Sequence, residues 1–516
     1  MPNSQTDALY QLIKSLSRGE KRHFKVYVKR TQSSENAKFI QLFDVLDKMK
    51  KYEEAKISDK APDIKRSQIP NLKANLYKQL LLSLRLKHFN NNVDMQIRQQ
   101  LDYAKLLYNK GLYMQSLRLL DKTKGIAMEA QQNMLCVEII EFEKLIESQY
   151  ITRSIEGRAE QLTKESQQLD KTIYRSNRLS DLALQLYGLY IKMGHIRSEK
   201  DEKRVEQFFE QKLKEIEGVD KPANLSFYEQ LHLYRSYVWY FYILQNFPYC
   251  YRYADKWVNL FVKKTAMIER EPFHYVKGLN NLLAALFNTR YYSKFLEVLD
   301  LLKEFEEYEV VKLHENIQIQ VFLFLSIHRI NKHFLEGTFT EAIELVPAIE
   351  AQIKVLGKKL DKHRILVFYY KIACIYFASD DYSTAIDYLN KILYQKNVQL
   401  REDIHCFARI LLLISHFELN HHTLIESQVK STYRFLKKMN DFHAVQQSII
   451  QFLRRLPKIL PAQLPDEFVA LHTTLVALSA DPYEKRTFLY FDIISWLESK
   501  IEGRPVEEVI QGKFLK

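Results

Sequence analysis

The sequence has little of what sheet-rich, disulfide-bonded or membrane-spanning proteins need. Only 12 glycines and 12 prolines occur in 516 residues, whereas a sheet protein of this length needs many turn residues. The four cysteines form no C-x-x-C pair, which argues against a disulfide framework and a structural zinc site. The longest apolar stretches, such as 321–327 and 410–415, are far shorter than the roughly 20 residues of a membrane span. Because residues 1–30 also lack the apolar core of a signal peptide, we expect a cytoplasmic protein with no membrane partner.

Motifs for catalysis and cofactor binding are also missing. No glycine lies in G-x-x-x-x-G-K-[ST] or G-x-G-x-x-G, and no G-x-S-x-G turn occurs. His314-Glu315 begins like a zinc-peptidase helix, but Gln318 stands where the second histidine ligand must be. His416 and His421 are five residues apart, which predicts different faces of one helix. We therefore expect no catalytic residue, no cofactor, no metal and no enzyme activity.

The sequence does contain a loose repeat of about 40 to 47 residues. Its clearest unit has Asp380 at a turn, the aromatic Tyr382 two positions later and the small Ala385 five positions later. Such a period predicts stacked helical hairpins, because one hairpin cannot bury its apolar face alone. Similar units lie at Gly111/Tyr113/Ser116, Tyr249/Tyr251/Ala254, Arg290/Tyr292/Phe295, Gly337/Phe339/Ala342 and Asn420/His422/Ile425.

The unit Gly337-Thr338-Phe339-Thr340-Glu341-Ala342 resembles the tetratricopeptide repeat, which has Gly, then Tyr two positions on, then Ala three further. The resemblance covers roughly 360 residues, 93–457, with units longer than the usual period of about 34. It implies an all-α, right-handed solenoid of about eight irregular hairpins. The residues outside it are expected to form a basic N-terminal helical head at 1–90 and a C-terminal helical cap and tail at 458–516.

In tetratricopeptide arrays the first helix of each pair lines a groove that receives a peptide or a partner helix. Lys277 and Asn281, four residues apart, are similar to the clamp by which chaperone-binding members hold a terminal carboxylate. The matching Lys/Arg pair two repeats on is missing, so we do not assign that role. The candidate groove residues are Lys277, Asn281, Asn288, Gln318, Arg329, Arg364 and Lys371.

The head is strongly basic, since residues 1–90 hold 19 Lys plus Arg against 9 Asp plus Glu, or +10 of the net +13. Helical periodicity predicts helices over 7–16, 17–30, 34–49 and 67–89, with Ser17 and Glu20 forming a capping box. Beyond the array, helices are expected over 466–478 and 482–500, followed by a short basic tail. The stretch Leu12 to Ser17, with Glu20-Lys21-Arg22 and Phe24-Lys25, also resembles the head of an uncharacterised bacterial family of helical-repeat proteins.

Two functions follow as hypotheses. The first is a non-catalytic scaffold that binds a protein or peptide in the solenoid groove. The alternative is a nucleic-acid-associated factor whose basic head neutralises phosphates while Tyr27 and Tyr77 stack on bases; solvated helix faces would explain the same charges. The candidate patch for an acidic partner or a nucleic acid consists of Lys14, Lys21, Arg22, Lys25, Lys29, Arg30, Lys73, Lys78 and Arg85.

Overall fold

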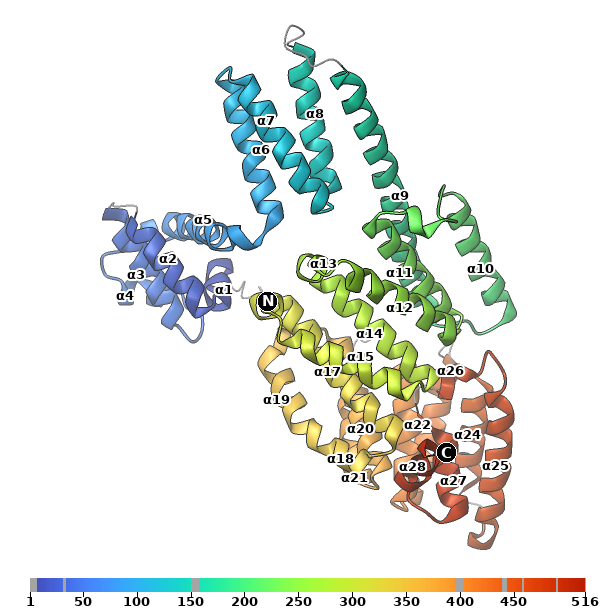
Figure 1. Cartoon of the computed structure of the whole chain (residues 1–516). Helices are drawn as coiled ribbons and strands as arrows, with labels where there is room; N and C mark the ends of the chain where they lie inside the picture. Colours follow the sequence, from blue (N-terminus) through green and yellow to red (C-terminus); the bar gives the residue numbers. More distant parts are fainter. Residues whose placement is uncertain are drawn as a thin grey trace. The chain divides into compact units, whose positions relative to one another are not determined.

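A computed structural model describes residues 7–30, 34–149, 157–394, 402–438, 443–456, 459–488 and 491–515. All regular elements in these ranges are helices, and the ranges contain no strand (Figure 1). The predicted all-α class is therefore confirmed for this part of the chain. Within it, no helix combines the length and the apolarity that a membrane crossing requires. The chain divides into two compact units, residues 1–173 and 174–516, which we describe separately.

The head in unit 1 contains the four predicted helices, a short additional α-helix, α4, and a 3-10 helix at Arg66–Gln68. Ser17 N donates to Glu20 Oε2 at 2.7 Å and Glu20 N donates to Ser17 Oγ at 3.2 Å, so the capping box is confirmed. Phe24 and Phe43 are fully buried with ring centroids 5.0 Å apart. The head helices are α1 (Ala8–Ser15), α2 (Arg18–Arg30), α3 (Ser34–Lys48), α4 (Ala55–Lys60) and α5 (Ile69–His88).

The rest of unit 1 is held together by an apolar core and a buried ion cluster. Lys124 Nζ lies 2.8 Å from Glu143 Oε2 and 3.0 Å from Glu165 Oε2, while Arg158 Nη2 lies 2.9 Å from Glu143 Oε1. Burial raises the pKa of Glu143 to about 6 against the opposing effect of both cations. The cluster links α7 (Tyr113–Glu129), α8 (Asn133–Gln149) and α9 (Arg158–Met193), and α9 continues into unit 2. The remaining helix of this part is α6 (Val93–Asn109).

Unit 2 begins with helices that pack mainly on their neighbours in sequence. A continuous hydrophobic core extends from Leu179 to Val506 and includes the C-terminal Trp496, and a second, smaller cluster of buried residues includes Leu182, Phe209 and Ile243. The unit thus has no separate core at its C-terminal end within the described residues. Its helices are α10 (Glu199–Lys214), α11 (Phe227–Ile243), α12 (Phe247–Lys263), α13 (Ala266–Arg270), α14 (Pro272–Thr289), α15 (Tyr292–Glu306), α16 (Glu309–Leu313), α17 (Glu315–Glu336), α18 (Phe339–Ala342), α19 (Val346–Leu356), α20 (Lys362–Ala378), α21 (Tyr382–Leu393), α22 (Glu402–Glu418), α23 (His422–Lys438), α24 (Ala444–Arg455), α25 (Leu464–Ser479), α26 (Lys485–Phe488), α27 (Ile493–Glu502) and α28 (Val506–Phe514).

The same turn joins helices at several places along the chain. One residue takes a left-handed conformation, with φ between 55° and 75°, at Gly111, Gln131, Gln245, Arg290, Gly337, Asp380 and Asn420. The next residue donates its N–H to a carbonyl five residues back, as Thr338 does to His333 at 3.1 Å, which is the Schellman end of a helix. Five residues after the left-handed position a side chain is fully buried, and at Ser116, Cys250 and Ala385 it is small. The predicted turn unit is thereby confirmed at five of its six positions.

The sixth position was predicted one helical turn too late. The turn lies at Gln245 and its small residue is Cys250, which donates to the Val238 carbonyl at 3.4 Å. Ala254 is also buried, one turn further along α12, and therefore imitated the pattern. A further turn, at Gln131, was not predicted. Glutamine has no special preference for left-handed backbone, so neither turn carried the usual signal.

The C-terminal region also differs from the prediction. The single helix expected over 482–500 is wrong, because Asp492 Oδ1 accepts the Ser495 N–H at 3.1 Å and starts a new helix, α27. The expected basic tail is helix α28 instead. This helix packs on the α17–α18 turn, where Gln511 Nε2 donates to the Gly337 carbonyl at 3.0 Å. The predicted boundaries near residues 92 and 457 remain predictions.

Candidate functional site

The candidate site lies on α11, α14, α17 and α20, the first helices of successive hairpins (Figure 1). Contacts link α14 to α17 and α17 to α20, while the rings of His232 in α11 and His274 in α14 have centroids 6.2 Å apart. We call the side of these helices that carries His232, His274 and Asn331 the A-face.

Two partly buried cations lie on the A-face without an ion pair to any described carboxylate. Arg235 Nη1 lies 3.0 Å from His232 Nδ1, and Lys277 Nζ lies 4.7 Å from the centroid of the Phe273 ring. Burial lowers the pKa of Arg235, and burial together with Arg235 and Arg364 lowers the pKa of Lys277. A cation removed from water without a counter-charge is costly. We call His232, Arg235, His274 and Lys277 the cation cluster.

Both histidines of the cation cluster are neutral at pH 7. Burial and Arg235 lower the pKa of His232 to about 4, and burial with Arg235, His232 and Lys277 lowers that of His274 to about 3. The carboxylate beside them is Glu271, whose Oε2 lies 3.9 Å from His274 Nε2 and whose Oε1 accepts the Tyr228 hydroxyl at 2.5 Å. The cluster therefore keeps an excess of positive charge.

A directed chain of hydrogen bonds crosses the A-face beside the cluster. Lys371 Nζ donates to Asn331 Oδ1 at 2.6 Å, Asn331 Nδ2 donates to His328 Nδ1 at 3.2 Å, and His328 Nε2 donates to Asn280 Oδ1 at 3.1 Å. The chain joins α20, α17 and α14 and holds His328 as a neutral imidazole. Burial, followed by Lys371, lowers the pKa of His328 to about 3, and burial lowers the pKa of Lys371 to about 8.

The structure brings together some of the groove residues predicted from the sequence. Lys277, Arg364 and Lys371 share the A-face, with Arg364 over the Phe324 ring at 5.8 Å. Other predicted residues point to local partners or to solvent: Asn281 accepts from its neighbour Asn280 at 3.5 Å, Asn288 Nδ2 donates to the Ala284 carbonyl at 2.7 Å, Gln318 Nε2 donates to the Lys312 carbonyl at 2.8 Å, and Arg329 is exposed.

The residues predicted from the sequence did not include His232, Arg235, His274, His328 or Asn331. A signal for them existed, because three successive first helices each carry a histidine followed three residues later by Arg, Lys or Asn. Residues three apart share a helix face. The prediction that His416 and His421 lie on different faces of one helix is wrong. Helix α22 ends at Glu418, so the two histidines meet across the turn with their Nδ1 atoms 3.1 Å apart. Only two described imidazoles meet there, and no metal-binding group of three is present among the described residues.

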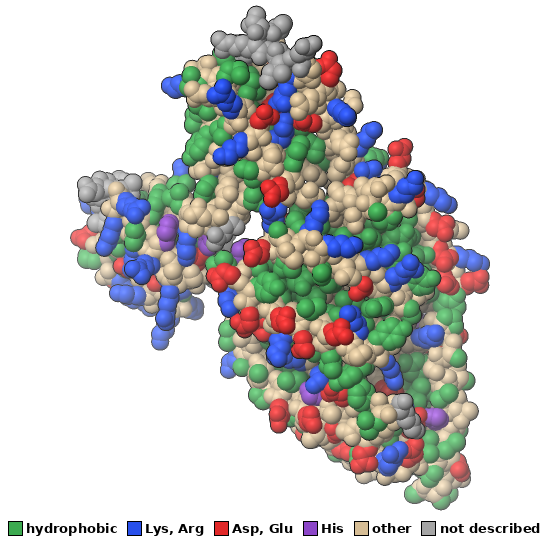
Figure 2. All heavy atoms as spheres, viewed as in Figure 1, with side chains coloured by type: hydrophobic (Ala, Val, Ile, Leu, Met, Phe, Trp, Pro, Cys, Tyr) green, Lys and Arg blue, Asp and Glu red, His purple; other side chains and the backbone are tan. Residues whose placement is uncertain are grey.

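The basic head contains a mixture of paired and unpaired cations. Figure 2 shows Lys and Arg side chains over the surface of the head. Lys21 pairs with Asp47 and Lys25 with Asp44, each at 2.7 Å. Lys73 pairs with Asp7 and Glu54, and Lys14 donates to the Asp47 carbonyl. The predicted residues that are exposed and form no ion pair with a described residue are Arg22, Lys29, Arg30, Lys78 and Arg85.

The aromatic residues of the head contribute mostly to its core. Phe24 is buried, and Tyr27 packs in the head with its hydroxyl donating to Gln79 at 2.9 Å. Tyr77 is exposed. A shallow hollow of ≈ 400 Å³ lies on α2, lined by Lys21, Arg22, Lys25, Val26, Lys29 and Asp47.

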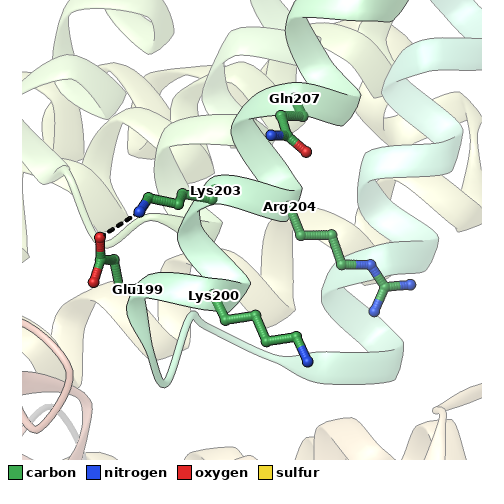
Figure 3. A pocket seen from close by; sticks show the side chains of 5 residues that line it. All are labelled: Glu199, Lys200, Lys203, Arg204 and Gln207. Carbon is green, nitrogen blue, oxygen red and sulfur yellow. Dashed lines mark ion pairs between the residues drawn. The ribbon is translucent and has the colours of Figure 1, made fainter.

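A second hollow, of ≈ 460 Å³, lies on the solvent side of α10 (Figure 3). Lys203 reaches Glu199 at 2.5 Å, while Lys200 and Arg204 extend away from that pair. All of its lining side chains come from one helix, and the ion pair is widely exposed. We assign it no function.

A comparison with protein-family models finds no match to the chain, and a comparison with curated proteins finds no similar sequence.

Proposed function

We propose that the chain is a non-catalytic, cytoplasmic scaffold whose hairpins form a tetratricopeptide-like solenoid of about eight irregular repeats. The recurring left-handed turns, each followed by a buried residue, support this arrangement. In such a solenoid the A-face lines the groove, where a peptide or helix of a protein partner is seated.

The observation that carries the proposal is the cation cluster. Arg235 and Lys277 are partly buried, come from neighbouring first helices and have no described carboxylate as ion-pair partner. Buried cations without a counter-charge lower the stability of the fold, so stability does not explain their presence. An acidic group on a partner would offset that cost, and it would do so in the groove.

Affinity capture of the full chain from its native extract, after nuclease treatment, tests this function. We expect protein partners that the Arg235→Gln/Lys277→Gln variant no longer retains. The matched control is Arg252→Gln/Lys303→Gln, which removes two exposed charges from α12 and α15. Equal capture by both variants, or loss of all partners on nuclease treatment, would contradict the proposal.

A second candidate function is nucleic-acid binding by the head. It is favoured by the hollow on α2, where Arg22 and Lys29 have no described ion-pair partner. Contacts to phosphates weaken steeply with salt. We would therefore expect binding to single-stranded RNA whose affinity falls linearly with salt on logarithmic axes, with a smaller slope for Arg22→Gln/Lys29→Gln.

A further inference from the structure

The cation cluster concentrates its charge in a small area. Arg235 contacts His232 at 3.0 Å, the rings of His232 and His274 are 6.2 Å apart, and Lys277 follows His274 by one helical turn. Glu271, the carboxylate at its edge, is engaged by the Tyr228 hydroxyl. Two cations and two neutral imidazoles thus face one region of the A-face, and Arg364 of α20 adds positive potential at Lys277.

The amount and the form of this charge select the chemical class of the ligand. A single carboxylate carries one negative charge and would leave the second cation uncompensated. A phosphoryl group carries a charge of about −1.5 to −2 at pH 7 and offers three acceptor oxygens. The guanidinium of Arg235 can bind two of these oxygens in a fork, the ammonium of Lys277 adds a point charge, and each neutral imidazole has one N–H to donate.

We propose that the cation cluster is a subsite for the phosphoryl group of a phosphorylated side chain on the protein partner. The partner as the source rests on the proposed scaffold function. It is favoured because the A-face continues along successive helices, which suits a peptide chain better than a small molecule.

Calorimetric titration of the full chain tests the subsite, with inorganic phosphate and malonate as probes and sodium chloride to match the ionic strength. We expect phosphate to bind at least tenfold more tightly than malonate. Affinity should fall at least tenfold in Arg235→Gln/Lys277→Gln and be kept in Arg252→Gln/Lys303→Gln. Equal affinity for malonate, or unchanged affinity in the cluster variant, would overturn the proposal.

Two additional measurements test the source of the phosphoryl group and the role of the positive charge at position 277. A short peptide containing phosphoserine should bind more tightly than inorganic phosphate; if it binds less tightly, a free phosphate is the ligand and the phosphopeptide is excluded. Lys277→Arg keeps the charge and should retain phosphate binding, whereas loss of binding in this variant would refute the role of the charge.

The result separates this inference from the proposed function. If phosphate fails to bind while captured proteins still depend on Arg235 and Lys277, the scaffold stands and the phosphoryl subsite fails. If phosphate binds and no protein is captured, the subsite stands and the scaffold fails.

Discussion

Replacing Lys124 by methionine should destabilise the region of α7, α8 and α9. The Lys124 side chain is 7% exposed and lies 2.8 Å from Glu143, which is 0% exposed, and 3.0 Å from Glu165. Removing one partner of a buried ion pair costs about 3 to 5 kcal/mol. Because Arg158 still reaches Glu143 at 2.9 Å, we expect the lower end, about 3 kcal/mol.

Hydrogen exchange of the full chain measures this cost locally, since amides of α7 and α8 report the free energy of opening there. A double-mutant cycle with Glu143→Gln should give a coupling energy of about 2 kcal/mol, because each single variant leaves charges that the other had balanced. The matched control is the exposed pair of Glu199 and Lys203 on α10, for which Lys203→Met should cost less than about 0.5 kcal/mol. A coupling energy as small as that of the control pair would show that the buried pair of Lys124 and Glu143 does not stabilise this region.

Three further predictions concern the turns and the hydrogen-bond chain. Gly337→Ala should lower the free energy of unfolding by more than about 2 kcal/mol and increase hydrogen exchange in α28, because its Cβ would lie 2.7 Å from Gln511 N. Gly503→Ala, whose Cβ would meet nothing within 4 Å, should cost about 1 kcal/mol. Urea unfolding measures both costs, and equal values would contradict a close contact at Gly337. Arg290→Gly should be neutral or stabilising by up to about 1 kcal/mol in thermal unfolding, since φ is 55°, and clear destabilisation would argue against a left-handed residue there. His328, with its pKa lowered to about 3, favours folding above its unfolded pKa near 6.5 and loses that contribution as the pH falls. We expect a loss of about 2 kcal/mol between pH 6.5 and 5, and a shallower dependence in His328→Gln; parallel profiles would contradict this.

Most of the correctly predicted helical hairpins have a recognisable turn residue, whereas the turn at Arg290 was predicted from the spacing to Tyr292 and Phe295 alone. Gly337 and Asp380 tolerate left-handed backbone, so the spacing to the buried Ala342 and Ala385 was readable. At Gln245 the turn residue carried no signal, and the helix start was marked instead by Asn246, which caps α12, and by a proline in its first turn. Gln245 adopts the left-handed turn, but only the residues that follow it indicate a helix start in the sequence.

The candidate site was harder to predict because it depends on pairing between distant residues. Lys21 and Lys277 have the same side chain, yet Lys21 finds Asp47 on another helix and Lys277 finds no described carboxylate. Composition gave the excess charge of the head correctly, but several of those cations are used within its fold. The cations that matter to the proposal lie in a part of the chain that is nearly neutral overall, so net charge pointed away from them.

Binding of a partner at the A-face can be tested with a photo-cross-linking amino acid, p-benzoylphenylalanine, placed at Phe273, which is 40% exposed and lies beneath Lys277. The matched position is Tyr291 at the α14–α15 turn, which is 52% exposed. Illumination of native extract should give discrete, nuclease-resistant protein cross-links from position 273 and few from position 291. Equal cross-linking at the two positions, or products that disappear with nuclease, would contradict the claim that the A-face is where this protein binds its partner.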